Sequence, residues 1–363
     1  MAELDGPQIG TSANNFFQSD RDIAIQERRA TKQQNKDGDP IECTSKVLCM
    51  ILPEKIDDLD YVYIGESGFI AKKINLSTKK TVKVFKGHTG PITCLGLWYK
   101  DGIEYLITGS WDKTLKKWDS KTKESLCTFS SHTDFVKSLT ISHKTSTLFS
   151  GSSDKHIRSW NLLTGEPLKV FKRHTRGIED LTFDEGETFL FSASSDGLVI
   201  KWNPLSGECL QIFEGHLTSV YALKIFEEEM WTASADMTVK RWDLYTGKSD
   251  MSLEHPDFVK CLAIRGPYVI TGSRDESIRV FDIGSGKLIK VIDGHFDEVS
   301  CTATREKKLY TGSLDCTLRT WSLTDITSQE PQPKQTVQEE TSSSMLTEEE
   351  ERELEELMEA EDM

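Results

Sequence analysis

The sequence predicts an all-β protein built from repeated four-stranded antiparallel sheets, and three observations support this prediction. A His, an Asp and a Trp or Phe recur in that order six times, at intervals of about forty residues. The Asp always lies six residues before the aromatic residue. Each Asp stands at a tight turn between two short segments in which apolar and polar residues alternate, which is the pattern of a β-hairpin. The six sets are His88/Asp112/Trp118, His132/Asp154/Trp160, His174/Asp196/Trp202, His216/Asp236/Trp242, His255/Asp275/Phe281 and His295/Asp315/Trp321.

The elements of one repeat follow in a constant order. A pair of apolar, β-forming residues opens the hairpin, small residues lead to the Asp, and alternation resumes up to the aromatic residue. A polar turn such as residues 163–166 comes next, and a fourth short strand leads to the following His. Because one such sheet cannot bury both of its faces alone, we expect the sheets to stack around a common axis. The hairpin segments are 106–119, 148–161, 190–203, 230–243, 269–282 and 309–322.

This pattern resembles the WD-repeat β-propeller family, whose repeats of about 40–45 residues carry a Gly-His pair and a Trp-Asp pair. The resemblance covers roughly residues 41–323 and implies a propeller fold. The Gly-His pairs are Gly87-His88, Gly215-His216 and Gly294-His295, and the Trp-Asp pairs are Trp118-Asp119 and Trp242-Asp243.

A seventh, degenerate unit precedes the six clear repeats. Residues 46–85 contain apolar patches at suitable intervals, but Gly68 stands where the Asp would be, Ile74 replaces the Trp, and the His is missing. The resemblance implies that the two chain ends pair to close the ring, and residues near 40–44 are the expected closing strand. We therefore predict a seven-bladed β-propeller of four-stranded antiparallel blades over residues 41–324.

The flanks outside the predicted ring differ from it in composition. Residues 1–40 are polar, which predicts a mostly disordered N-terminal tail, and residues 325–345 form a low-complexity linker. Residues 346–363 form an acidic tail in which Thr347 and Glu350 make a capping box for a short amphipathic helix. Its apolar face would carry Leu346, Leu354, Leu357 and Met358.

The net charge of −15 arises mainly from the C-terminal tail. Residues 322–363 contain 14 acidic residues against Lys334 and Arg352, so the predicted ring is nearly neutral. A neutral ring with an acidic tail argues against nucleic-acid binding. No apolar run approaches the roughly 18–20 residues that span a bilayer, and the N-terminus lacks the pattern of a secretory signal. The eight scattered cysteines favour reduced thiols, so we expect a cytoplasmic or nuclear protein without a membrane span.

The repeated polar residues allow two interpretations. Each repeat has Ser or Thr close before the Asp, so every repeat offers a Ser/Thr, His and Asp set of the kind found in nucleophilic triads. An active site, however, occurs once per domain, and a sixfold set favours a structural role. The family resemblance implies that hydroxyl, His, Asp and Trp form a hydrogen-bonded tetrad inside each blade. In the fifth of these six sets Phe281 lacks the indole N–H, so that tetrad would have one bond fewer.

Other chemistry is not indicated by the sequence. It contains no Walker A loop, dinucleotide fingerprint or His-Glu-x-x-His motif. Outside the repeats only His143 and His156 remain, too few for a convincing metal site. We therefore predict no catalytic residues, no cofactor and no metal.

The family resemblance implies that the face around the central channel binds peptides. Its contacts come from the residue before each repeat Asp and from residues beside the first apolar residue of each innermost strand. The tetrapeptide Asp-Phe-Val-Lys occurs at 134–137 and again at 257–260, in equivalent places. Such an aromatic and basic rim suits an acidic, phosphorylated or helical peptide, although these residues could instead pack within loops. The candidate rim residues are Trp111, Phe135, Lys137, Tyr221, Phe258, Lys260 and Arg274.

The leading functional prediction is a non-catalytic scaffold or adaptor that binds partner proteins or peptides as a monomeric ring within larger complexes. The first alternative is a substrate receptor of a cullin-type ubiquitin ligase. The residues before the ring contain no recognisable F-box, which argues against this alternative. A propeller-based enzyme is the alternative from another class. Whether the acidic tail docks on the rim of its own chain or binds another molecule remains open.

Overall fold

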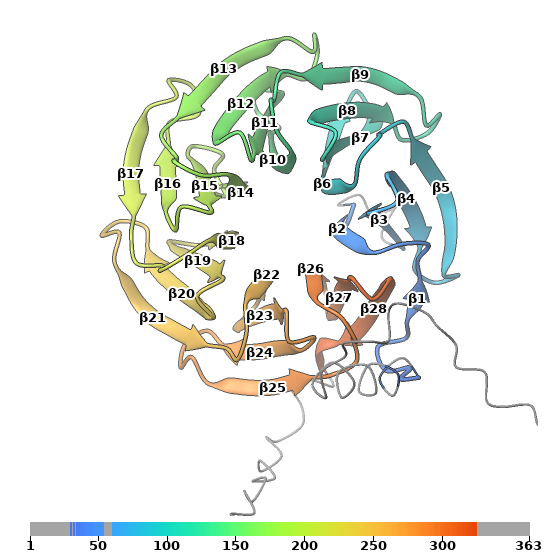
Figure 1. Cartoon of the computed structure of the whole chain (residues 1–363), viewed down its shortest axis with the longest axis vertical. Helices are drawn as coiled ribbons and strands as arrows, with labels where there is room; N and C mark the ends of the chain where they lie inside the picture. The colour runs from blue at the N-terminus through green and yellow to red at the C-terminus, as the bar shows by residue number, and fades with distance from the viewer. Residues whose placement is uncertain (1–29, 31, 33, 54–59, 325–363) are drawn as a thin grey trace, which may run out of the picture. The chain divides into compact units, whose positions relative to one another are not determined.

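The computed structural model describes residues 30, 32, 34–53 and 60–324, which form seven four-stranded antiparallel sheets around a central axis (Figure 1). The predicted seven-bladed β-propeller is confirmed, and the degenerate first unit forms a complete blade. Six blades consist of four consecutive strands each: β2–β5, β6–β9, β10–β13, β14–β17, β18–β21 and β22–β25. The seventh blade combines β26–β28 with β1.

The described strands have the following bounds: β1 (Ile41–Glu42), β2 (Val47–Ile51), β3 (Tyr61–Glu66), β4 (Ile70–Asn75), β5 (Lys80–Lys86), β6 (Ile92–Lys100), β7 (Ile103–Ser110), β8 (Thr114–Asp119), β9 (Ser125–Ser130), β10 (Val136–Ser142), β11 (Thr147–Ser152), β12 (His156–Asn161), β13 (Pro167–Lys172), β14 (Ile178–Phe183), β15 (Leu190–Ser194), β16 (Val199–Trp202), β17 (Cys209–Phe213), β18 (Val220–Phe226), β19 (Glu229–Ser234), β20 (Thr238–Asp243), β21 (Ser249–Glu254), β22 (Val259–Arg265), β23 (Tyr268–Ser273), β24 (Ile278–Asp282), β25 (Leu288–Ile292), β26 (Val299–Arg305), β27 (Lys308–Ser313) and β28 (Thr317–Ser322).

The ring closes where β1 from the N-terminal side pairs with β28 from the C-terminal side, as expected for the segment near residues 40–44. Ile41 lies opposite Leu318 in this antiparallel pair. A hydrogen bond from the N–H of Thr320 to the carbonyl of Gly38, 2.6 Å, extends the closure before β1. Gly38 has φ +73°, and a side chain there would lie 2.7 Å from the ring of Trp321, so this close approach requires glycine.

Aromatic residues join neighbouring blades in a regular way. Phe85, on the outer strand β5 of the first blade, packs edge-on against Trp118 of the second blade, with ring centroids 6.0 Å apart. Such contacts bury the blade faces that a single sheet would leave exposed, and they add the favourable edge-to-face geometry of aromatic pairs. The equivalent pairs farther round the ring are Phe129–Trp160, Phe171–Trp202 and Phe213–Trp242.

Each innermost strand contains one bulge at the same place. In β10 the pairing register shifts between Val136 and Ser138, which leaves Lys137 without a partner residue in β11. A bulge of this kind re-aims the side chain of the extra residue. All seven extra residues line one cavity of about 560 Å³ on the ring axis. They are Leu48, Thr93, Lys137, Glu179, Tyr221, Lys260 and Ser300.

The N-terminal residues that the structure describes contact the sixth and seventh blades. The buried guanidinium of Arg319 donates hydrogen bonds to the carbonyls of Asp37, at 2.5 Å, and Asn35, at 3.2 Å. Lys32 forms an ion pair with Glu276 at 2.9 Å. The disorder predicted for the N-terminal tail falls mainly on residues 1–29, 31 and 33, outside the described residues. The predicted linker and the amphipathic helix with Leu346, Leu354, Leu357 and Met358 also lie outside them.

Within residues 30, 32, 34–53 and 60–324, no helix has the length and apolar character needed to cross a membrane.

Candidate functional site

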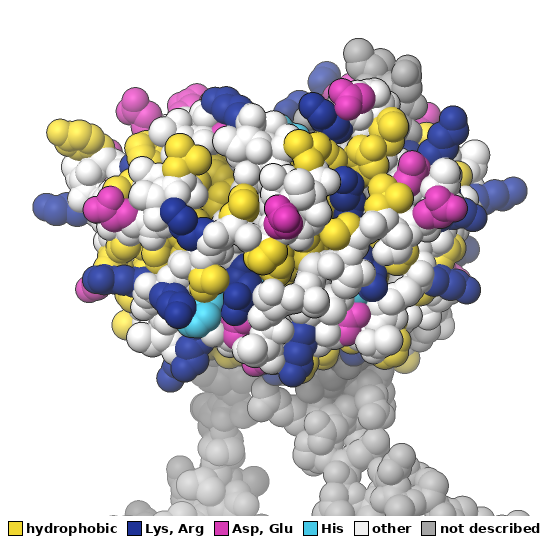
Figure 2. All heavy atoms as spheres, turned by 90° about the horizontal axis from the view of Figure 1, so that it is seen from above, with side chains coloured by type: hydrophobic (Ala, Val, Ile, Leu, Met, Phe, Trp, Pro, Cys, Tyr) yellow, Lys and Arg dark blue, Asp and Glu magenta, His cyan; other side chains and the backbone are white. Residues whose placement is uncertain are grey.

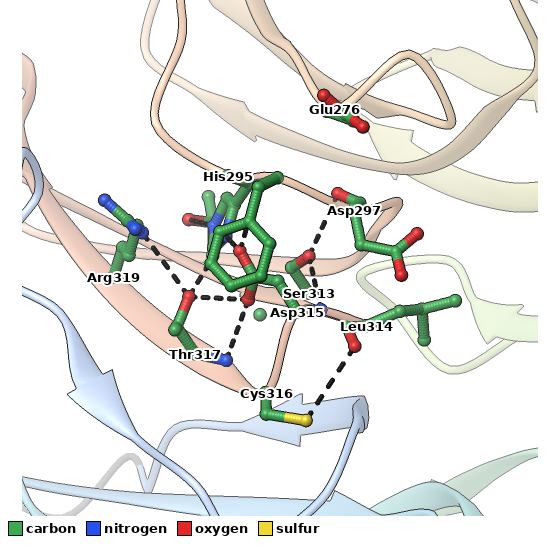
Figure 3. Close-up of polar contacts among 12 residues, drawn as sticks. Glu276, His295, Asp297, Ser313, Leu314, Asp315, Cys316, Thr317 and Arg319 are labelled. Carbon is green, nitrogen blue, oxygen red and sulfur yellow. Dashed lines mark hydrogen bonds and ion pairs between the residues drawn. The ribbon is translucent and has the colours of Figure 1, made fainter. Parts of the chain in front are cut away.

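A hydroxyl, a His, an Asp and a Trp form a continuous hydrogen-bonded set in five repeats. In the third blade His132 Nδ1 lies 2.8 Å from Asp154 Oδ2, and His132 Nε2 lies 2.8 Å from Ser150 Oγ. The indole N–H of Trp160 donates to the same Ser150 oxygen at 2.9 Å. The equivalent sets are His88/Thr108/Asp112/Trp118, His174/Ser192/Asp196/Trp202, His216/Thr232/Asp236/Trp242 and His295/Thr311/Asp315/Trp321. Figure 3 shows His295 and Asp315 of the last set.

Each repeat Asp also holds its own turn together. Asp154 accepts hydrogen bonds from the backbone N–H groups of Thr133, at 3.1 Å, and His156, at 3.0 Å. Burial alone would raise the pKa of Asp154, but the hydrogen bonds from His132 and from these N–H groups outweigh it and lower the pKa to about 2. The carboxylate is therefore ionised and its acceptor positions are used inside the blade.

Ser150, His132 and Asp154 are hydrogen-bonded in the same order as a nucleophilic triad, but their burial differs from that of an active site. Ser150 is fully buried, and His132 is only 7% exposed. The Ser150 oxygen already accepts the indole N–H of Trp160. A substrate carbonyl has no access to this hydroxyl, so the arrangement supports a structural role for the set.

The sixth blade departs from the predicted tetrad of His255, Asp275 and Phe281. His255 Nε2 does lie 2.8 Å from Thr271 Oγ1, but its Nδ1 lies 3.2 Å from the carbonyl oxygen of Leu253. Asp275 instead receives two hydrogen bonds from the guanidinium of Arg279, at 3.1 and 2.5 Å. The predicted bond between His255 and Asp275 is therefore wrong, beyond the missing indole N–H.

The physical reason for this departure lies in the residue after the His. In the five intact repeats, that residue donates its backbone N–H to the Asp, as Thr133 does. Here it is Pro256, which has no N–H, and Arg279 satisfies the carboxylate in its place. Burial, followed by the charge of Arg279, lowers the pKa of His255 to about 4. Pro256 is the sequence signal that could have identified the altered set.

The first blade replaces the tetrad with a buried ion pair. The Nζ of Lys72 lies 2.6 Å from Glu66 Oε1, and both side chains are almost fully buried. The other carboxylate oxygen of Glu66 accepts hydrogen bonds from the hydroxyls of Thr44, at 2.6 Å, and Ser45, at 3.1 Å. The sequence shows that the His, Asp and Trp are missing here, but it does not show which residues take their place.

Three of the candidate rim residues, Lys137, Tyr221 and Lys260, line the axial cavity. The other four lie in turns or directly before innermost strands, at the same end of the strands: Trp111, Phe135, Phe258 and Arg274. Trp111 of the second blade stacks on Phe135 of the third, with ring centroids 5.1 Å apart and planes 20° from parallel. Trp111 is 43% exposed and Phe135 is 39% exposed. The two rings form an aromatic shelf, defined here as Trp111 and Phe135, that spans the boundary between two blades.

The two rim lysines are paired with carboxylates from the next blade. Lys137 forms an ion pair with Glu179, and Lys260 lies 3.7 Å from Glu298. Lys260 also lies over the ring of Tyr221, 3.6 Å from its centroid. The mouth of the cavity is therefore electrostatically more balanced than the basic rim expected from the sequence.

Arg274 carries a different kind of contact. Its guanidinium lies 5.2 Å from the ring centroid of Phe258 in the same blade, a cation–π arrangement. None of the described carboxylates forms an ion pair with it. The structure thus places all seven candidate residues on one face, but it separates the aromatic shelf in blades two and three from Arg274 and Phe258 in blade six.

Two residues at this mouth were missed by the sequence analysis. Glu298 stands directly before the first apolar residue of its innermost strand, the place that Phe135 and Phe258 hold in their repeats. That equivalence is the signal that could have identified it. Leu48 was missed because the first blade lacks the His and Asp from which the other positions were counted.

In the part of the chain that the structure describes, no group of three or more His, Cys, Asp and Glu residues could hold a metal ion. Four of the cysteines, Cys49, Cys94, Cys261 and Cys301, line the axial cavity at equivalent places. Burial raises the pKa of the Cys301 thiol to about 12, so these positions favour inert, packed thiols.

Comparison with known proteins agrees with this architecture. A family model described as "WD domain, G-beta repeat" matches six segments that together make up more than half of the chain: 79–119, 123–161, 165–203, 207–243, 247–282 and 286–322.

The chain is also similar to several curated proteins. An uncharacterized WD repeat-containing protein of Schizosaccharomyces pombe is 33% identical over 325 residues, which cover 85% of this chain and 88% of that protein. The coronin-like protein of Saccharomyces cerevisiae is 34% identical over 73 residues, 20% of this chain and 11% of that protein. The mitochondrial division protein 1 of Aspergillus clavatus is 29% identical over 130 residues, 26% of this chain and 20% of that protein. Six matched repeats and a relative aligned along most of both chains show that this chain belongs to the WD-repeat family of β-propellers.

Proposed function

We propose that this protein is a non-catalytic interaction scaffold that binds a partner protein or peptide on the face that carries the aromatic shelf. The observation that supports this most directly is the exposed stack of Trp111 on Phe135 beside the axial cavity. Exposed Trp and neighbouring aromatic rings are the residue types that contribute most binding energy in interfaces. The side of the ring in Figure 2, by contrast, intersperses hydrophobic side chains with Lys, Arg, Asp and Glu.

The charges on this face narrow the chemistry of the proposed partner. Lys137 and Lys260 are each neutralised by a glutamate, so they contribute little net attraction for an anion. Among the residues that the structure describes, the guanidinium of Arg274 is a rim cation that contacts an aromatic ring and no carboxylate. The proposed partner segment therefore presents a bulky apolar side chain to the shelf and a carboxylate or phosphate to Arg274.

The burial and hydrogen bonding of the repeated polar residues support the proposal that the protein is not an enzyme. The hydroxyl, His and Asp groups that would be candidates for catalysis are buried and hydrogen-bonded inside individual blades. We further propose that the protein acts as a monomeric ring in the cytoplasm or nucleus, within larger complexes.

The test is affinity purification of the full chain followed by direct binding measurements with each recovered partner. The variants Trp111→Ala and Arg274→Glu should weaken binding at least tenfold, whereas Tyr245→Ala should leave it unchanged. Tyr245 is the matched control because it is 94% exposed and lies in the turn between β20 and β21, at the opposite end of the strands. If every partner keeps its affinity for a folded Trp111→Ala/Arg274→Glu double variant, the proposed binding face is wrong.

A further inference from the structure

Two cysteines lie next to each other at the ring closure. In the β1–β28 pair Ile41 lies opposite Leu318 and Glu42 opposite Thr317; Cys43 directly follows β1, and Cys316 directly precedes β28, in a turn where it has φ +66°. The N–H of Cys43 donates to the carbonyl of Cys316 at 2.8 Å, which continues the ladder to this pair. This backbone hydrogen bond brings the two residues side by side, and disulfides join residues that are close in space, with Cα atoms usually about 4.4–6.8 Å apart.

The side chains of the two cysteines have room to meet. Both line one cavity of about 540 Å³ beside the closure. The Cys43 thiol lies 3.8 Å from the carbonyl oxygen of Ile41. The Cys316 thiol lies 3.9 Å from that of Leu314 (Figure 3). These are weak contacts, so rotating either side chain toward the other costs little.

We propose that Cys43 and Cys316 form an oxidation site at which a peroxide converts the two thiols into a disulfide across the ring closure. Cys316 is the more accessible thiol, since it stands in the turn before β28, whereas Cys43 is held in the closing segment. Because burial raises the pKa of both thiols, the reaction is slow at neutral pH and requires sustained exposure to the oxidant.

The chemistry balances in two steps. The Cys316 sulfur attacks one peroxide oxygen of hydrogen peroxide, the O–O bond breaks, and a sulfenic acid and one water result. The Cys43 sulfur then attacks the sulfenic sulfur, the S–S bond forms, and a second water leaves with the proton from Cys43. The two thiols are oxidised by two electrons in total, and the peroxide is reduced to water.

The consequence of this disulfide would be a covalently closed ring. In the reduced protein the seventh blade depends on the short strand β1 and a few flanking hydrogen bonds to hold the N-terminal side of the chain. A disulfide joins residues far apart in the chain, and such links restrict the unfolded state most strongly. Oxidation therefore stabilises the closure without changing the blades themselves.

The experiment exposes the full chain to hydrogen peroxide for several hours at pH 8, blocks remaining thiols, and maps tryptic peptides without reduction. The expected product is the fragment 37–46 linked to the fragment 309–319, with the loss of two hydrogen atoms. The midpoint of thermal unfolding should rise by on the order of 5 °C and return to its starting value with dithiothreitol.

Two variants provide the comparison. Cys316→Ser should lose both the linked fragment and the rise in the midpoint, while Cys127→Ser, on β9 of another blade, should keep both. Mapping of the unmodified sequence needs no variant, so the test holds even if a substitution impairs folding. Oxidation of Cys316 without linkage to Cys43, linkage of any other pair, no oxidation, or an unchanged midpoint in the linked protein would each overturn the proposal.

Discussion

Trp111 stacks on Phe135 across the boundary between the second and third blades, although 24 residues separate them in the chain. We expect this contact to couple the two side chains energetically. In a double-mutant cycle with Trp111→Ala and Phe135→Ala, measured by chemical unfolding, the coupling free energy should be about 0.5–1.5 kcal/mol. The control cycle pairs Trp111→Ala with Phe258→Ala on the sixth blade, and there the effects should be additive. Additivity in the first cycle would show that the stack does not persist in solution.

The tetrad of the third blade predicts a large effect at Asp154. Replacing it with Ala leaves the Nδ1–H of His132 and two backbone N–H groups without their acceptor. The free energy of unfolding should fall by about 1–3 kcal/mol, as measured by urea denaturation. Glu124→Ala is the control because Glu124 is exposed, and its effect should stay within about 0.5 kcal/mol. Equal effects of both substitutions would contradict the structural role of the tetrad.

The altered set in the sixth blade predicts a pH dependence of stability. The pKa of His255 is about 4 in the folded protein and about 6.5 in an unfolded chain. The unfolded chain therefore binds more protons in this interval, and the free energy of unfolding falls as the pH decreases from about 6.5 to about 4. His255→Gln should reduce this loss, whereas His143→Gln, at an exposed position, should not. Thermal unfolding midpoints across this range provide the measurement, and an identical slope for His255→Gln would refute the assignment.

Below this interval the repeat aspartates should dominate the pH dependence. Hydrogen bonds overcome the effect of burial and lower the pKa values of Asp154 and Asp196 to about 2. A carboxyl group with a lowered folded pKa stabilises the protein fully above its unfolded value of about 3.9 and loses that contribution as the pH falls toward 2. Circular dichroism should therefore show steep acid unfolding between about pH 4 and pH 2, and Asp154→Asn should make the transition shallower. A transition of unchanged steepness in that variant would contradict the low pKa.

The buried pair in the first blade predicts strong non-additivity. Lys72→Met leaves the carboxylate of Glu66 buried without its cation, which should cost about 3–5 kcal/mol. Adding Glu66→Leu removes the orphaned charge, so the double variant should be more stable than Lys72→Met alone. The measurement is equilibrium unfolding in urea. If the two effects simply add, Glu66 and Lys72 do not form a buried ion pair in solution.

The intact tetrads show how far the sequence can determine structure when its signals repeat. The fixed spacing of His132, Asp154 and Trp160 places each residue at a defined position of a defined strand. Nearly all contacts of a tetrad lie within one blade. The spacing of residues within one repeat was therefore sufficient to identify the residues of the tetrad. The sixth blade shows the limit of this inference: Pro256 and Arg279 redirect Asp275 through contacts that the spacing of the three marker residues does not report.

By itself, the sequence determined the all-β repeats and the number of blades, because these follow from periodicity within the chain, whereas the closing segment and the positions around the channel were expectations that the family resemblance implied. Only the tertiary structure decided that Lys137 pairs with Glu179, that Lys260 pairs with Glu298, and that Cys43 lies next to Cys316. Each of these contacts joins different blades or the two ends of the ring. Their geometry depends on how far one sheet is rotated against the next, on the bulge that turns a side chain into the cavity, and on the register of the closing strand. None of these three features produces a periodic pattern in the sequence.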